Sequence, residues 1–141
     1  MYYLAYGMNT NVEQMARRCP KSRSLGTVVL KGHRLAFKGC CDAVVDATSE
    51  MECALWDITS DCESALDMLE GFPDYYGKKE VTVYHNGRKI RAMIYFMQDI
   101  SRLSMPSESY LNIVVQGYAD HNMDIFQVYR ALEELTDVYH H

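Results

Sequence analysis

The sequence lacks the features that direct a chain into or across a membrane. No apolar run approaches the ~20 residues that span a bilayer. The opening MYYLAYGMN has no basic region, and tyrosines and a glycine interrupt its apolar residues, which argues against a secretory signal peptide. We therefore expect a cytoplasmic protein that has no membrane partner.

Basic charge is also scarce. The chain has 14 Lys and Arg residues against 19 Asp and Glu residues, which gives a net charge of −5. An acidic surface is a poor platform for a phosphate backbone, so nucleic acid is not an expected partner. One dense basic cluster lies on a predicted hairpin, where we interpret it as solvated surface: Lys78, Lys79, Arg88, Lys89 and Arg91.

No C-x-x-C pair occurs among the cysteines. The five residues form an odd set, Cys19, Cys40, Cys41, Cys53 and Cys62. This pattern argues against a disulfide framework and against a zinc site. We expect reduced thiols, most of them buried, and no metal centre.

The chain also lacks internal repeats, low-complexity tracts and linkers rich in proline, glycine or serine. It has 141 residues, of which 48% are hydrophobic and 23% charged, a balance typical of a globular protein. A chain of this length forms one ordinary domain. We therefore predict a single domain over residues 1–141.

The first third of the chain has a β pattern interrupted by one helix. Residues 2–5 predict a short buried strand that enters a tight loop at residues 6–9. Thr10-x-x-Glu13 is a capping box that predicts a helix to about Arg18. Four strands joined by short turns are then expected, over 27–30, 34–38, 43–48 and 52–58, with turns at 31–32 and 49–50.

From residue 60 onward, the sequence predicts three helices and one β-hairpin. Ser60-x-x-Glu63 predicts the start of a helix that Gly71 and Pro73 end. Asn86-Gly87 supplies the positive φ angles of a type I′ turn and predicts a hairpin. The expected hairpin strands are 80–84 and 89–97, followed by helices over 107–119 and 124–140. Strands first and helices later indicate an α+β fold.

Two local features are candidates for ligand binding or catalysis. Gly7 allows close backbone approach just before a helix N-terminus, where the free N–H groups of residues 7–10 suit a carboxylate or an oxyanion. Glu70 lies at the C-terminal end of its helix, where a negative charge is mildly unfavourable. Many such junctions bind nothing and many such glutamates are surface residues, so neither feature alone predicts a function.

These two stretches carry a resemblance to the γ-glutamylcyclotransferase-like family, also called AIG2-like. Leu4-Ala5-Tyr6-Gly7-Met8-Asn9 resembles the family's (F/L)AYGSN signature, and Leu66-Asp67-x-x-Glu70-Gly71 resembles its L-D-x-x-E-G motif. Further segments match in the same order. They are Arg18-Cys19-Pro20, Gly32-His33-Arg34-Leu35-Ala36-Phe37, Ala54-Leu55-Trp56-Asp57-Ile58, Tyr75-Tyr76, Ala92-x-x-Tyr95, and Pro106-Ser107-x-x-Tyr110 through Gly117.

The resemblance implies a fold and a site. The fold is a closed, mixed β-barrel flanked by helices, with the site at a barrel opening. Glu70 is implied as the catalytic residue, and no cofactor or metal is implied. The implied substrate-binding residues are the loop residues Tyr6, Gly7, Met8 and Asn9, whose backbone amides hold the glutamyl group, and the pocket tyrosines Tyr76 and Tyr110. Met8 stands where the family has serine.

The implied activity is cyclisation of a γ-glutamyl amine or amino acid to 5-oxoproline with release of the free amine. Its partner is a small-molecule substrate; the leaving amine and the oligomeric state stay open. The alternative is a non-catalytic module on the same fold that binds a small molecule or a protein. Met8 favours this alternative and Glu70 argues against it. The other tyrosines Tyr2, Tyr3, Tyr84 and Tyr129 are expected to pack.

Overall fold

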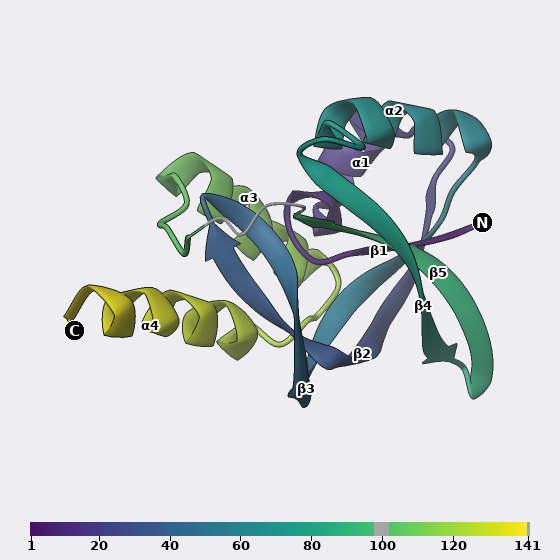
Figure 1. Ribbon diagram of the computed structural model, residues 1–141. Helices are drawn as coiled ribbons and strands as arrows, with labels where there is room; N and C mark the ends of the chain where they lie inside the picture. The colour runs from purple at the N-terminus through teal and green to yellow at the C-terminus, as the bar shows by residue number, and fades with distance from the viewer. Residues whose placement is uncertain (98–101, 141) are drawn as a thin grey trace.

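The computed structural model describes residues 1–97 and 102–140, with side chains through residue 137 (Figure 1). Within these ranges, no helix is both long and apolar enough to cross a bilayer. The elements in chain order are β1 (Tyr2–Ala5), the 3-10 turn η1 (Met8–Thr10), α1 (Val12–Arg18), β2 (Arg23–Lys38), β3 (Cys40–Asp57), α2 (Ser60–Glu70), β4 (Tyr76–His85), β5 (Arg88–Met97), α3 (Glu108–Asp120) and α4 (Phe126–His140).

The strands form one mixed sheet in the order β2-β3-β1-β5-β4. β1 is the central strand: it runs antiparallel to β3 and parallel to β5. The predicted α+β class and the mixed sheet are confirmed. Closure is not seen, because the strands of residues 1–97 leave β2 and β4 at the two sheet edges without a ladder between them.

The β2–β3 hairpin differs from the four short strands expected. It is a single pair of long strands that turns at Gly39, where φ is 77°. Gly32, expected in a turn, lies instead inside β2 at a register shift between Lys31 and His33. Residues 49–50 likewise lie inside β3, where Glu50 pairs with Lys31. Gly32 does mark a change in backbone direction, but the change is a bulge within a continuous strand and not a turn between two strands.

Both helix starts were predicted one residue away from the cap. Asn11, not Thr10, caps α1: its side chain accepts a hydrogen bond from the Gln14 N–H at 3.0 Å. Thr59, not Ser60, caps α2, and its hydroxyl accepts from the Cys62 N–H at 3.2 Å. Ser, Thr and Asn are all favoured at the N-cap position, so residue type alone does not decide between adjacent candidates.

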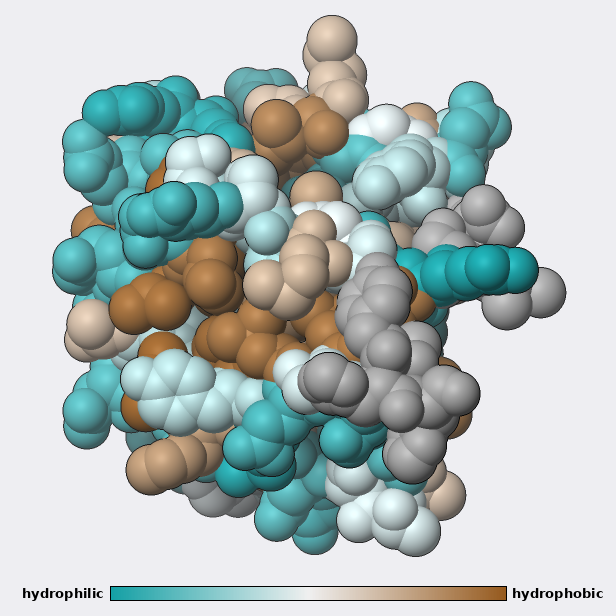
Figure 2. Space-filling model, turned by 90° about the vertical axis from the view of Figure 1, so that its left-hand side faces the viewer, coloured by the Kyte–Doolittle hydropathy of each residue, from teal (hydrophilic) through white to brown (hydrophobic). Residues whose placement is uncertain are grey.

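The turn of the β4–β5 hairpin and the last two helices follow the expectation, whereas β4 begins at Tyr76, four residues before the expected start. Asn86 and Gly87 have φ angles of 51° and 77°, as a type I′ turn requires. Ser107 caps α3 by accepting from the Tyr110 N–H at 3.2 Å. α3 and α4 extend along the left side of Figure 1, and that face has an apolar centre surrounded by hydrophilic residues (Figure 2).

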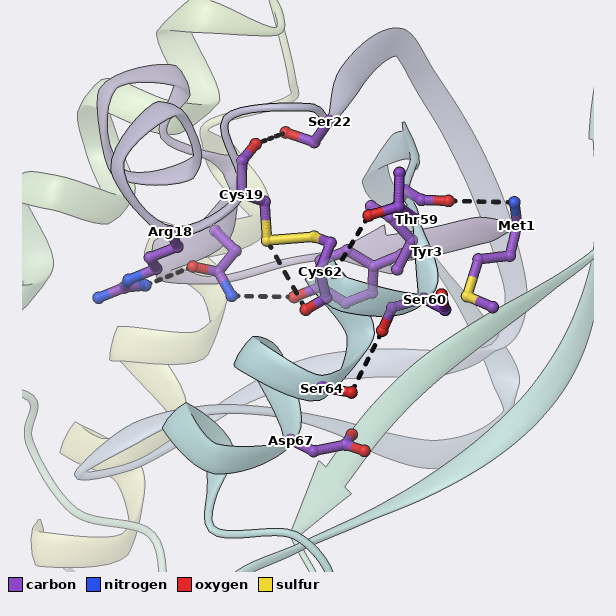
Figure 3. Close-up of a disulfide and its surroundings, with 12 residues drawn as sticks. Met1, Tyr3, Arg18, Cys19, Ser22, Thr59, Ser60, Cys62, Ser64 and Asp67 are labelled. Atoms are coloured by element: carbon purple, nitrogen blue, oxygen red, sulfur yellow. Dashed lines mark hydrogen bonds between the residues drawn. A yellow bond between two sulfur atoms is a disulfide. The ribbon is translucent and has the colours of Figure 1, made fainter.

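The expectation of reduced cysteines is wrong for one pair. Cys19, which ends α1, forms a disulfide with Cys62 in the first turns of α2, and their Cα atoms lie 5.2 Å apart (Figure 3). The other three cysteines are free. The pair is 43 residues apart in the chain and has no motif spacing, so only the packing of α1 against α2 brings the two thiols together.

Candidate active site

A cavity of about 170 Å³ opens between the end of β1, the end of α2 and the start of β3. All seven residues predicted from the sequence line it: Tyr6, Gly7, Met8, Asn9, Glu70, Tyr76 and Tyr110. Five different elements or loops supply these side chains, so their convergence is a property of the fold rather than of any local motif.

The loop after β1 is held from behind by α3. Gly117 allows α3 to pack this closely against the loop, since a Cβ there would lie 2.0 Å from Thr10 Oγ1. The Tyr118 hydroxyl donates to the Tyr6 carbonyl at 2.8 Å. Gly7 is equally confined, because a Cβ would lie 2.9 Å from both Cys41 Cβ and the Tyr110 hydroxyl. Gly7 therefore serves the packing of the loop against β3 as well as any ligand.

The expectation that the N–H groups of residues 7–10 are all free is wrong for Thr10. The Thr10 N–H donates to the Gly7 carbonyl at 3.1 Å and closes the η1 turn. Thr10 Oγ1 donates to the same carbonyl at 2.7 Å. The amides of Gly7, Met8 and Asn9 stay available as candidates for a ligand contact at the cavity wall.

Glu70 is the last residue of α2 and points into the cavity. The helix stops there because Gly71 adopts the left-handed conformation, with φ 63° and ψ 37°. Burial raises the pKa of Glu70 from 4.5 to about 7, although the nearby Arg18 guanidinium acts in the opposite direction. Asn9 Nδ2 donates to Glu70 Oε1 at 3.5 Å. Glu70 is therefore poised to exchange a proton near neutral pH.

The cavity tyrosines are fixed by backbone contacts. The Tyr76 hydroxyl donates to the Cys41 carbonyl at 2.7 Å, and the Tyr110 hydroxyl accepts from the Cys41 N–H at 2.9 Å. The Tyr6 hydroxyl donates to the Tyr95 carbonyl at 2.7 Å. Burial raises the pKa of all three phenols, so they stay neutral and act as polar walls.

Charged contacts hold α2 against the β4–β5 hairpin. Lys78 on β4 forms ion pairs with Glu63 at 2.8 Å and with Asp67 at 2.9 Å. The Tyr95 hydroxyl on β5 donates to Asp67 Oδ1 at 2.5 Å. Asp67 belongs to the same L-D-x-x-E-G motif as Glu70, one turn earlier in α2. Its contacts explain how the motif fixes the position of Glu70.

Sequence reasoning missed several cavity residues. Tyr3, assigned to packing, is buried but also lines the cavity, where its hydroxyl accepts from Asn9 Nδ2 at 3.0 Å. Tyr2, Tyr84 and Tyr129, also assigned to packing, are exposed. Arg18 was matched to the Arg-Cys-Pro segment without a role, yet it lines the cavity beside Glu70. The remaining unassigned lining residues are Leu4, Cys40, Cys41, Leu69, Tyr75 and Tyr95.

Arg18 also explains what Met8 does in place of serine. Arg18 is the last residue of α1 and lies next to the disulfide (Figure 3). Its Nη2 donates to Met8 Sδ at 2.8 Å, and its Nη1 donates to Asn9 Oδ1. The disulfide at Cys19 follows Arg18 directly and joins α1 to the helix that carries Glu70. Arg18 and Glu70 are thus supported by one covalently linked pair of helices.

These features define a class: a small α+β protein with a tyrosine-lined cavity and one carboxyl group whose pKa is near neutral. The model of the family "Gamma-glutamyl cyclotransferase, AIG2-like" matches residues 3–112. The chain therefore belongs to the gamma-glutamyl cyclotransferase, AIG2-like family. No curated protein matches it closely enough to count as a relative.

Several solved structures share the fold. A structure described as gamma-glutamyl cyclotransferase has a TM-score of 0.82 and 22% identity, covering 92% of this chain and 85% of that one. An uncharacterised Homo sapiens protein has a TM-score of 0.79 and 22% identity, over 91% of this chain and 84% of that one. YkqA from Bacillus subtilis has a TM-score of 0.74 and 22% identity, over 84% of this chain and 48% of that one.

Proposed function

We propose that residues 1–141 form a single cyclotransferase domain that converts a γ-glutamyl amine or γ-glutamyl amino acid to 5-oxoproline and the free amine. The observation that carries the proposal is the position of Glu70, whose pKa is raised to about 7, in a cavity walled by the Tyr6–Asn9 loop. Membership of the family supports the reaction type.

The substrate supplies its own nucleophile. The α-amine attacks the γ-carbonyl carbon and closes a five-membered ring, and the C–N bond to the leaving amine breaks when the resulting tetrahedral intermediate collapses. Because both reacting groups belong to one molecule, the main task of the protein is to hold the bent conformer. Tyr6, Tyr76 and Tyr110 line the cavity with hydroxyls already fixed by the backbone, which makes them suitable rigid walls.

Two protons leave the α-nitrogen as its ammonium group becomes the N–H of the ring amide, and the leaving nitrogen gains two as it becomes an ammonium group. The α-amine is mostly protonated at neutral pH, so a base has to remove a proton, and the departing amine has to receive one. We assign both steps to Glu70, since a carboxyl group with a pKa near the working pH can accept a proton and then donate it. The overall exchange is balanced and requires neither metal nor cofactor.

Charge develops on the γ-carbonyl oxygen during the attack. We assign its stabilisation to backbone N–H groups of Gly7, Met8 and Asn9, which border the cavity. The close contact of Gly7 with Cys41 and Tyr110 keeps this backbone fixed, and fixed donors need no reorganisation when the charge appears.

The test is a screen for 5-oxoproline release. The panel holds γ-glutamyl amino acids, γ-glutamyl amines, ε-(γ-glutamyl)lysine and glutathione. Release of 5-oxoproline together with one equivalent of amine from at least one compound is expected. Binding of such compounds without release from any of them would contradict the proposal and favour a non-catalytic binding module.

A further inference from the structure

Arg18 is the one cationic side chain that lines the cavity, as far as the described residues go. Its guanidinium nevertheless forms no ion pair within that part of the chain. Its hydrogen bonds go to two neutral acceptors, the Asn9 side-chain oxygen and the Met8 thioether sulfur. By contrast, the neighbouring Arg17 is exposed and pairs with Glu13 at 2.6 Å.

A guanidinium with neutral partners at a cavity wall is an incomplete anion site. Arginine presents several N–H donors in a planar fork that matches the two oxygens of a carboxylate. A thioether is a weak acceptor, so a carboxylate displaces it readily. Glu70 lies close enough to Arg18 to feel its charge, but burial keeps the pKa of Glu70 near neutral. The cavity therefore retains capacity for a second, fully ionised carboxylate.

We propose that Arg18 is the carboxylate-binding residue of this cavity, and that its Nη2 leaves the Met8 sulfur to bind a carboxylate of the substrate. The identity of the ligand rests on the proposed function. A γ-glutamyl amino acid offers two such groups, the α-carboxylate of the glutamyl part and the carboxylate of the leaving amino acid. A γ-glutamyl amine offers only the first.

The test measures affinities by calorimetry in a Glu70→Gln background, so that bound ligand is not consumed. The three ligands are γ-glutamyl-alanine, γ-glutamyl-ethylamine and the α-amide of γ-glutamyl-ethylamine, which carry two, one and no carboxylates. Each is titrated into the background protein and into proteins with Arg18→Gln, Arg18→Lys or Arg17→Gln added. Arg17→Gln is the matched control, because it removes the adjacent charge outside the cavity.

Arg18→Gln should weaken the affinity for the contacted carboxylate roughly ten- to hundred-fold. A loss for γ-glutamyl-alanine alone assigns Arg18 to the leaving amino acid; an equal loss for γ-glutamyl-ethylamine assigns it to the glutamyl α-carboxylate. In either case Arg18→Lys recovers part of the loss, and Arg17→Gln changes nothing.

Two results would overturn the inference. One is an unchanged affinity for both carboxylate ligands in Arg18→Gln. The other is an equal loss for the α-amide, which would mean that Arg18 only supports the Met8–Asn9 loop. Failure of the proposed function looks different: the wild-type protein then releases no 5-oxoproline from any compound, whatever the binding of these ligands shows.

Discussion

Asn9 and Glu70 are joined by a hydrogen bond, from Asn9 Nδ2 to Glu70 Oε1 at 3.5 Å, although 61 residues separate them in the chain. The same amide donates to the Tyr3 hydroxyl at 3.0 Å, and its oxygen accepts from Arg18. Asn9 is buried; its contact with Tyr3 is buried as well, and its contacts with Glu70 and Arg18 are partly buried. Asn9 therefore links the loop after β1 to both charged side chains of the cavity.

The first prediction concerns this link. Asn9→Leu keeps the number and branching of the side-chain heavy atoms but leaves a buried tyrosine hydroxyl and a guanidinium without this partner, which typically costs about 1–3 kcal/mol. We expect the free energy of unfolding, measured with urea, to fall by about that amount. A double-mutant cycle with Glu70→Leu, which removes the accepting oxygen, should show coupling between the two positions. Strict additivity would mean that the Asn9–Glu70 contact has no energetic weight.

The second prediction follows from the raised pKa of Glu70. Its ordinary value is 4.5 and its value in the folded protein is about 7, so the unfolded chain ionises first as pH rises. The wild type is therefore destabilised relative to Glu70→Gln between these pH values, by up to about 3 kcal/mol above pH 7. Urea unfolding of both proteins from pH 4 to 8 tests this sign. A difference that does not change with pH would mean that Glu70 is not desolvated.

The third prediction concerns Met8. Met8→Ser removes the sulfur that accepts from Arg18 Nη2 and leaves the backbone in place. We expect relative turnover among γ-glutamyl compounds to change more than the free energy of unfolding does, because the side chain borders the cavity. Steady-state kinetics on three substrates measures the change. Identical substrate ratios in both proteins would leave only the Met8 backbone with a role.

The fourth prediction concerns the disulfide between Cys19 and Cys62. Removing a cross-link that closes a long loop typically costs about 2–4 kcal/mol. A dithiol reductant should lower the unfolding free energy of the wild type by that amount. The matched control, Cys19→Ser with Cys62→Ser, should not respond to the reductant. Equal insensitivity of the wild type, or labelling of five thiols in the untreated protein, would show that the disulfide does not form.

The sequence predicts local structure best where one residue type has one physical role. Asn86-Gly87 is such a case, since two consecutive positive φ angles suit few other residues. Gly32 is not: a positive φ serves a turn or a bulge equally well, and the long-range pairing of β2 with β3 decides between them. Sheet closure and the Cys19–Cys62 pairing likewise depend on tertiary placement that no local pattern contains.

The candidate site shows the same division. The motif around Glu70 was visible in the sequence because family resemblance marked it, and the cavity contains all the residues so marked. Arg18 and Tyr3 are recognised as cavity residues only from the three-dimensional structure. Arg18 ends a helix, where side chains are usually solvated, and Tyr3 lies in a buried strand, where side chains usually serve packing.

The most direct test of the account is the rate of 5-oxoproline formation by Glu70→Gln under saturating substrate. Glutamine keeps the shape and hydrogen bonding of the side chain but cannot take the proton, so kcat should fall by roughly 10²–10⁴-fold while substrate binding is largely kept. Asp61→Asn, an exposed position on the same helix outside the cavity, should retain most of the rate. A near-normal kcat for Glu70→Gln in a protein whose wild type is active would contradict the assignment of Glu70.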